Sequence, residues 1–166
     1  MSNISINSMY VQCPDAKYVI VLSKKPFRSH VSGIGRDPNS WAVSEVAYVS
    51  MRDTRKTLPI HEFGHSFGGL RDEYYEINPA LNGIPGDPNC ITKAEALLKW
   101  AVWPDILADA QQEKWKGCGG ICGSGCANLL RPTENSIMRY QLIEPYGTEF
   151  NAPCKKQILD RINARA

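Results

Sequence analysis

The chain has 166 residues, of which 43% are hydrophobic and 22% are charged, and its formal net charge is +2. That length and apolar content predict one folded domain with a real core, which we expect to be a monomer. Charges of both signs are interspersed, without a basic patch for nucleic acid, a membrane-binding helix or an apolar run able to span a bilayer, so nucleic acid and membranes are excluded as expected partners.

The first part of the chain carries signals for two strands and a helix. An apolar run at 17–23, rich in β-branched residues, predicts a strand buried on both faces. Residues 24–40 contain prolines and glycines typical of a loop, part of which, near 30–36, could form a short edge strand. Residues 41–51 predict a second strand. Thr57 is the favoured cap of the following helix, because Pro59 is tolerated only near a helix start.

The second part of the chain reads as loops and helices. The prolines and glycines of 78–89 predict an irregular loop. Three helices are expected after it: one opened by a capping box at Thr92 and Glu95 and running through about Val102, one opened by Pro104 and running toward Lys116, and one at 153–164.

The order of these elements predicts an α+β fold. We expect a small twisted mixed sheet, then an active-site helix, then an irregular half that contains further helices. A cleft would separate an N-terminal subdomain of about 1–69 from a C-terminal subdomain of about 70–166, within one domain spanning 1–166.

The motif H-E-x-x-H is formed by His61, Glu62 and His65. On a helix, positions i and i+4 lie on one face, so the two imidazoles can aim at a single point. Neutral imidazole is a good ligand for Zn²⁺, which makes Zn²⁺ the predicted cofactor. Glu62 leaves the helix at a different angle and can act as a general base on a metal-bound water. The alternative is an ordinary helix, but two of the chain's three histidines lie in the motif.

The six cysteines predict disulfides and therefore export from the cell. Three of them, Cys118, Cys122 and Cys126, lie in a glycine-rich segment, and the sequence cannot choose among the pairings. A second metal site is the alternative, although this spacing is not that of a zinc knuckle. The first residues lack the layout of a signal peptide. We expect a secreted or extracellular protein whose signal peptide is not part of this sequence.

A second motif reads Ser136-Ile137-Met138-Arg139-Tyr140. Alone it is weak, because a methionine is most often a core residue. With H-E-x-x-H, a glycine turn and an aspartate, it resembles the Met-turn of metzincin peptidases, which reads S-x-M-x-Y in the astacin-like and serralysin-like branches. The resemblance implies that Met138 lies beneath the metal and that Tyr140 helps to bind the metal or the transition state. The alternative for Tyr140 is a buried phenol bonded to backbone.

The longer string H-E-F-G-H-S-F-G-G-L-x-D-E-Y, which starts at His61, is similar to the bacterial IgA-peptidase family of zinc metallopeptidases. Arg131-Pro132-Thr133 adds to this resemblance, which covers roughly residues 17–160. It implies a metzincin-like catalytic domain with Glu62 as the base and zinc held by His61, His65 and a third ligand. The region before the first strand is short, so the helix that backs the metzincin sheet would be missing or irregular.

The third ligand does not fall at the standard metzincin position, three residues after the glycine. Counted from Gly68, that position is Arg71, whose guanidinium has no lone pair to give. Counted from Gly69, it is Asp72, and a double glycine makes a turn longer by one residue easy. We therefore predict Asp72 as the third ligand, with Glu73 as the second choice. A turn residue that bonds its own backbone is the alternative for Asp72.

These features predict a zinc-dependent endopeptidase that acts on extracellular or host proteins. The substrate would bind in extended form along an edge strand, for which 32–40 is the favoured segment. One alternative is a thermolysin-like site with Glu95 as the third ligand, which the glycine turn and the Met-turn disfavour. The other is a non-catalytic binding domain with a structural zinc, which the presence of Glu62 disfavours because a structural site needs no base.

Overall fold

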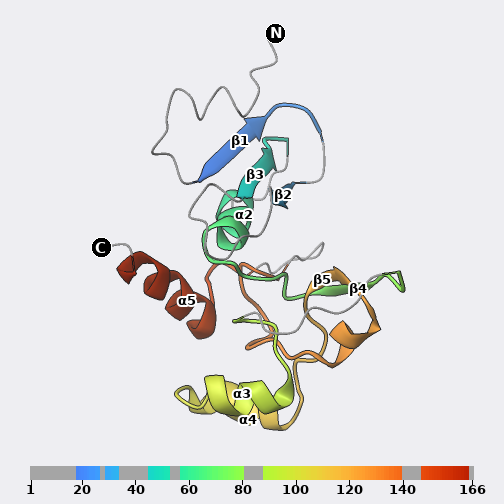
Figure 1. The fold of residues 1–166 in the computed structure, drawn as a ribbon, viewed down its shortest axis with the longest axis vertical. Helices are drawn as coiled ribbons and strands as arrows, with labels where there is room; N and C mark the ends of the chain where they lie inside the picture. The colour runs from blue at the N-terminus through green and yellow to red at the C-terminus, as the bar shows by residue number, and fades with distance from the viewer. Residues whose placement is uncertain are drawn as a thin grey trace. The chain divides into compact units, whose positions relative to one another are not determined.

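The described part of the chain is an α+β structure with four α-helices and two small sheets. The computed structural model describes residues 18–26, 29–33, 45–52, 57–80, 88–139 and 147–164, and Figure 1 shows its backbone. Contacts divide the chain into one unit at Met1–Thr54 and a second at Arg55–Ala166. The motif helix belongs to the second unit, and the subdomains of about 1–69 and 70–166 stay a prediction.

The first unit contains a mixed sheet formed by β1 (Val19–Ser23), β2 (His30–Gly33) and β3 (Glu45–Ser50). The central strand is β3, which runs parallel to β1 and antiparallel to β2. Val46 and Val49 of β3 are buried, as befits a central strand. All three strands lie within the segments predicted from the sequence, and the prediction of a mixed sheet is confirmed for the described residues.

The burial of β1 differs from the prediction. Ile20 is 42% exposed and Leu22 is 57% exposed, whereas Val19, Val21 and Ser23, which alternate with them, are half-buried. The reason is that β1 lies at an edge of the sheet, because Ala47 and Val49, which pair with Ile20 and Leu22 on the central strand, are buried. A continuous apolar run therefore does not guarantee burial on both faces.

The motif helix is α2 (Leu58–Ser66). Thr57 occupies the N-cap position as predicted, but its side chain makes no capping hydrogen bond, and Pro59 lies in the first turn. The helix ends before the double glycine, and Gly69 has a φ of 63°, a conformation that glycine adopts without strain. The Gly69 amide donates to the carbonyl of His65 at 3.0 Å, so the chain turns back at this point.

The rest of the second unit consists of short elements. They are β4 (Tyr75–Ile77) and β5 (Gly120–Cys122), which pair in parallel, α3 (Lys93–Lys99), α4 (Pro104–Gln111), the 3-10 helix η1 (Ser124–Asn128) and α5 (Ala152–Asn163). The helices α3 and α4 lie side by side, as Figure 1 shows.

The predicted helices exist, but two of them are shorter than predicted. The capping box is present, because Thr92 Oγ1 accepts from the Glu95 amide and the Glu95 carboxylate accepts from the Thr92 amide. The α3 helix nevertheless ends at Lys99, short of Val102. The α4 helix ends at Gln111, and Glu113 just beyond it has a φ of 56°, which a continuing helix cannot accommodate.

A small apolar cluster lies next to α2. Leu70, Met138 and Cys154 are buried together, with Phe150 and Ile158 packed against them. Of the apolar residues Ile158, Leu159 and Ile162 of α5, only Ile158 takes part. Leu159 and Ile162 of the same helix are 56% and 48% exposed, because α5 packs through a narrower face than its sequence indicates.

Two disulfides form in the second unit, Cys90–Cys118 and Cys122–Cys126. Cys118, Cys122 and Cys126 are all paired in these disulfides, so none of them has a free thiol to bind a metal. Cys154 is a buried thiol, and Cys13 lies outside the described residues. Within the described ranges, no helix has the length and apolar character needed to cross a membrane.

Candidate metal centre

Three side-chain atoms of the second unit converge on one point. His61 Nε2 and His65 Nε2 lie 3.1 Å apart, and Asp72 Oδ1 lies 3.1 Å from the first and 3.3 Å from the second. The two histidines project from consecutive turns of α2, and Asp72 follows the glycine turn that ends the helix. The structure therefore brings together the three residues predicted as metal ligands, and this group could hold a metal ion.

The second nitrogen of each histidine fixes the tautomer. His61 Nδ1 donates to the carbonyl oxygen of Ile137 at 2.7 Å, and His65 Nδ1 donates to that of Leu70 at 2.7 Å. A carbonyl can only accept, so each Nδ1 must carry the hydrogen. In the neutral ring, Nε2 then presents a lone pair, which is the state that a metal requires.

The spacing of the three atoms fits a tetrahedral ion. Zinc binds imidazole nitrogen and carboxylate oxygen at about 2.0–2.1 Å, and the corresponding tetrahedral edge is about 3.3 Å. The three observed separations, 3.1 to 3.3 Å, are close to that edge. Three lone pairs so near one another repel unless a cation or a proton lies between them, so the group could hold a metal ion.

In the metal-free protein, a proton on His65 can take the place of that cation. Burial lowers the pKa of His65, but the Asp72 carboxylate and the hydrogen bonds to Asp72 and Leu70 outweigh it and raise that pKa to about 9. Burial also opposes ionisation of Asp72, yet His65 and His61 hold the pKa of its carboxyl well below the usual range. Without a metal, a protonated His65 therefore forms an ion pair with an ionised Asp72.

Glu62 and Met138 both lie close to the helix turn that carries the two histidines. Glu62 is 3% exposed, and its carboxylate is close enough to contribute to the raised pKa of His65. Met138 Sδ packs against the helix between the two histidines, because a Cβ on Gly64 would lie only 2.6 Å from it. The side chains of His65 and Asp72 remain 17% and 21% exposed, so water can reach the site.

Asp72 is held by a close-packed glycine turn. Its carbonyl oxygen accepts from the Gly119 amide at 2.8 Å. Gly120 has a φ of 72°, and a Cβ there would lie 2.7 Å from Asp72 Oδ2. Only glycine fits this approach, and the Cys90–Cys118 disulfide anchors the same turn.

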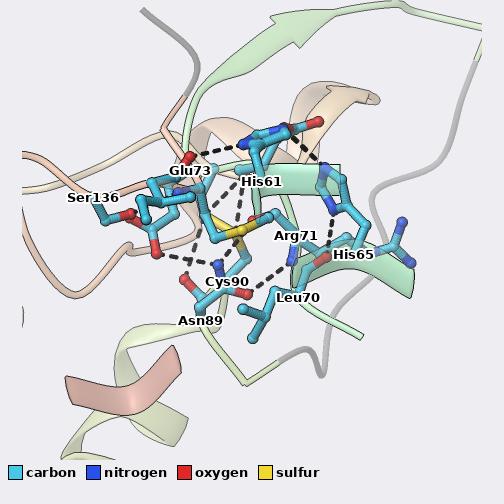
Figure 2. A network of polar contacts seen from close by, with 12 residues as sticks. His61, His65, Leu70, Arg71, Glu73, Asn89, Cys90 and Ser136 are labelled. Atoms are coloured by element: carbon cyan, nitrogen blue, oxygen red, sulfur yellow. Dashed lines mark hydrogen bonds and ion pairs between the residues drawn. A yellow bond between two sulfur atoms is a disulfide. The ribbon is translucent and has the colours of Figure 1, made fainter. Parts of the chain in front are cut away.

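Glu73, the second choice for the third ligand, lies elsewhere. It is fully buried, and its carboxylate accepts hydrogen bonds from Asn89, Ser136 and Asn151 rather than approaching the histidines. Burial raises the pKa of Glu73, while these donors act against that rise. Figure 2 shows Glu73, Asn89 and Ser136 gathered on one side of the network, away from His65.

The remaining predicted residues fall outside the metal group. The Glu95 carboxylate accepts from Thr92 and from Lys99 on α3, so it serves as a helix cap rather than as a third ligand. Tyr140 lies outside the described residues. The sequence did not point to Asn89 or to the carbonyls of Leu70 and Ile137, because neither a lone asparagine nor a backbone carbonyl carries a motif.

No model of a protein family matches the chain, and no curated protein matches it.

Proposed function

We propose that the protein is a zinc-dependent endopeptidase with a metzincin-like catalytic domain. The observation that carries this proposal is the convergence of His61 Nε2, His65 Nε2 and Asp72 Oδ1 within 3.3 Å, next to the buried Glu62. Two imidazoles and one carboxylate, with access for water, are typical of a catalytic rather than a structural zinc site. The S-x-M-x-Y motif and the position of Met138 beside α2 support the metzincin assignment.

Each residue has a distinct part in the proposed reaction. When bound, zinc supplies a Lewis acid for the scissile carbonyl and an acidified water. Glu62 takes a proton from the attacking water and passes it to the leaving amine. Tyr140 donates a hydrogen bond to the oxyanion, so Tyr140→Phe should lower kcat more than it changes KM.

The proposed substrate is an extended segment of an extracellular or host protein. Among the described strands, β2 lies at an edge of its sheet, so an extended peptide could add to its outer backbone. Ser32 and Gly33 of the predicted 32–40 segment belong to β2, and the rest of that segment lies outside the described residues. Two disulfides fit an exported protein, which we propose acts as a monomer.

The function is tested by digestion of unfolded casein with zinc-loaded protein. We expect cleavage that 1,10-phenanthroline stops and that stoichiometric zinc restores. Glu62→Ala should still bind zinc but lose at least about 100-fold in kcat, the usual contribution of a general base.

The same digestion separates a zinc peptidase from a non-catalytic binding domain with a structural zinc. If wild-type protein binds zinc but cleaves neither casein nor a peptide library, it is a binding domain with a structural metal. If Glu62→Ala cleaves at the wild-type rate, Glu62 is not the base.

A further inference from the structure

The side chain of Asn89 pairs with the backbone of the residue before Asp72. Asn89 Oδ1 accepts from the Arg71 amide at 2.9 Å, and Asn89 Nδ2 donates to the Arg71 carbonyl at 2.8 Å. Asn89 thus bonds both polar groups of one peptide residue, as a neighbouring strand would. Its side chain is fully buried, so water cannot replace these bonds.

Glu73, the residue after Asp72, is fixed from several segments at once. Its Oε1 accepts from Asn89 Nδ2 at 3.1 Å and from Asn151 Nδ2 at 2.7 Å, and its Oε2 accepts from Ser136 Oγ at 2.5 Å. Its backbone amide donates to the carbonyl of Met138 at 2.8 Å. Ser136 Oγ in turn accepts from the Met138 amide, which joins Glu73 to the predicted Met-turn.

Asp72 therefore lies between two residues whose backbones are held on both sides. We propose that Asn89 and Glu73 form a buried clamp that positions the Asp72 carboxylate for the metal. Both are positioning residues, because neither side chain lies in the group of His61, His65 and Asp72. Figure 2 shows Asn89 between Glu73 and Arg71, with dashed lines to both.

A clamp of this kind is needed because Asp72 stands on a loop. The two histidines are fixed by helix α2, whereas a loop aspartate would lose conformational freedom each time it bound a metal. Bonds that hold its neighbours remove that cost before binding, and outer groups that orient a ligand typically contribute about 10- to 100-fold in metal affinity.

The chain offers a matched control for this clamp. Asn89 and Asn151 are both buried amides that donate to Glu73 Oε1, but only Asn89 also bonds the Arg71 backbone. Asn151 instead caps α5 by accepting from the Cys154 amide. Removing either should lower the melting temperature, and only Asn89 should affect the metal.

The inference rests on the proposed metal site, and zinc affinity measured by competition with a chromophoric chelator tests it. Asn89→Ala and Glu73→Ala should lose about 10- to 100-fold in zinc affinity and shift the visible spectrum of bound cobalt(II). Asn151→Ala should stay within about threefold of wild type. Glu73→Gln should also stay within about threefold, because its amide oxygen can still accept from both asparagines.

The possible failures are distinguishable. Wild-type protein that binds no zinc would refute the metal site, and the clamp with it. Wild-type binding that Asn89→Ala leaves unchanged, or that Asn151→Ala weakens equally, would refute the clamp alone. If Asn89→Ala does not fold, Glu73→Ala carries the test, because it removes the acceptor for Asn89 Nδ2 and keeps the Asn89 bonds to Arg71; zinc affinity equal to wild type in Glu73→Ala would then refute the clamp.

Discussion

His61 Nδ1 lies 2.7 Å from the carbonyl oxygen of Ile137, a residue 76 positions away in the sequence. The next carbonyl, that of Met138, accepts from the amide of Glu73, the residue after Asp72. Two consecutive peptide groups of the predicted Met-turn therefore orient one histidine and one flank of the aspartate. This gives the segment a physical role that does not depend on the methionine side chain.

The packing of Met138 against α2 predicts a large effect of adding one methyl group. Gly64→Ala places a Cβ 2.6 Å from Met138 Sδ and 3.0 Å from Phe150, so it should destabilise the fold by about 1–3 kcal/mol. Alanine's better helix propensity offsets only about 1 kcal/mol of the strain. Gly125→Ala is the control, because a Cβ there meets nothing within 4 Å. Urea unfolding of both variants measures the difference, and equal stabilities would refute the packing.

The raised pKa of His65 predicts how stability and metal binding depend on pH. Its folded pKa of about 9 exceeds the ordinary 6.5, so the protonated ring stabilises the metal-free fold below pH 6.5. That contribution is lost as pH rises from 6.5 to 9. The melting temperature of metal-free protein should fall across this range.

Zinc must displace the same proton, so its affinity should change in the opposite direction. It should rise by about tenfold per pH unit up to pH 9 and level off above it. Chelator competition at pH 6.5, 7.5 and 8.5 measures the slope. An affinity independent of pH would show that His65 is neutral in the metal-free protein.

The two disulfides should differ in their contribution to stability. Cys90–Cys118 closes a loop with a separation of 28 residues, and Cys122–Cys126 closes one with a separation of 4. Chain entropy alone makes the longer loop worth about 2 kcal/mol more. Paired serine substitutions at each disulfide, compared by urea unfolding, test this. The paired serine substitution of Cys90 and Cys118 should also weaken zinc binding, because the neighbouring Gly119 amide donates to the Asp72 carbonyl. Identical effects of the two paired substitutions on stability and zinc affinity would contradict this role of Cys90–Cys118.

The sequence predicts the parts of the site whose geometry is local. His61 and His65 are one helical turn apart, so any α-helix brings them together. Asp72 can be predicted as the third ligand because the double glycine allows a longer turn and Arg71 cannot bind a metal. The capping box at Thr92 and Glu95 is equally local. The extent of β1 is predictable for the same reason, but its burial is not, since burial depends on the strand's place in the sheet.

The long-range contacts lie beyond such reasoning. Asn89 meets Glu73 across 16 residues, and Asn151 meets it across 78, with no spacing rule that links them. The sequence also cannot exclude Glu73 as a ligand, because no pattern near a metal motif distinguishes a carboxylate that binds the metal from one that accepts from buried amides. Cysteine pairing is unpredictable for the same reason, since it depends on which loops meet.

The most direct measurement is X-ray diffraction at the zinc absorption edge from crystals of zinc-loaded protein. Zinc at this site should give one strong anomalous peak within about 2.0–2.2 Å of His61 Nε2, His65 Nε2 and an Asp72 carboxylate oxygen. The peak should be absent from crystals of Asp72→Ala grown at the same zinc concentration. A peak at Glu73 or at the cysteines, or no peak at the two histidines of α2, would contradict the zinc site on which the proposed peptidase depends.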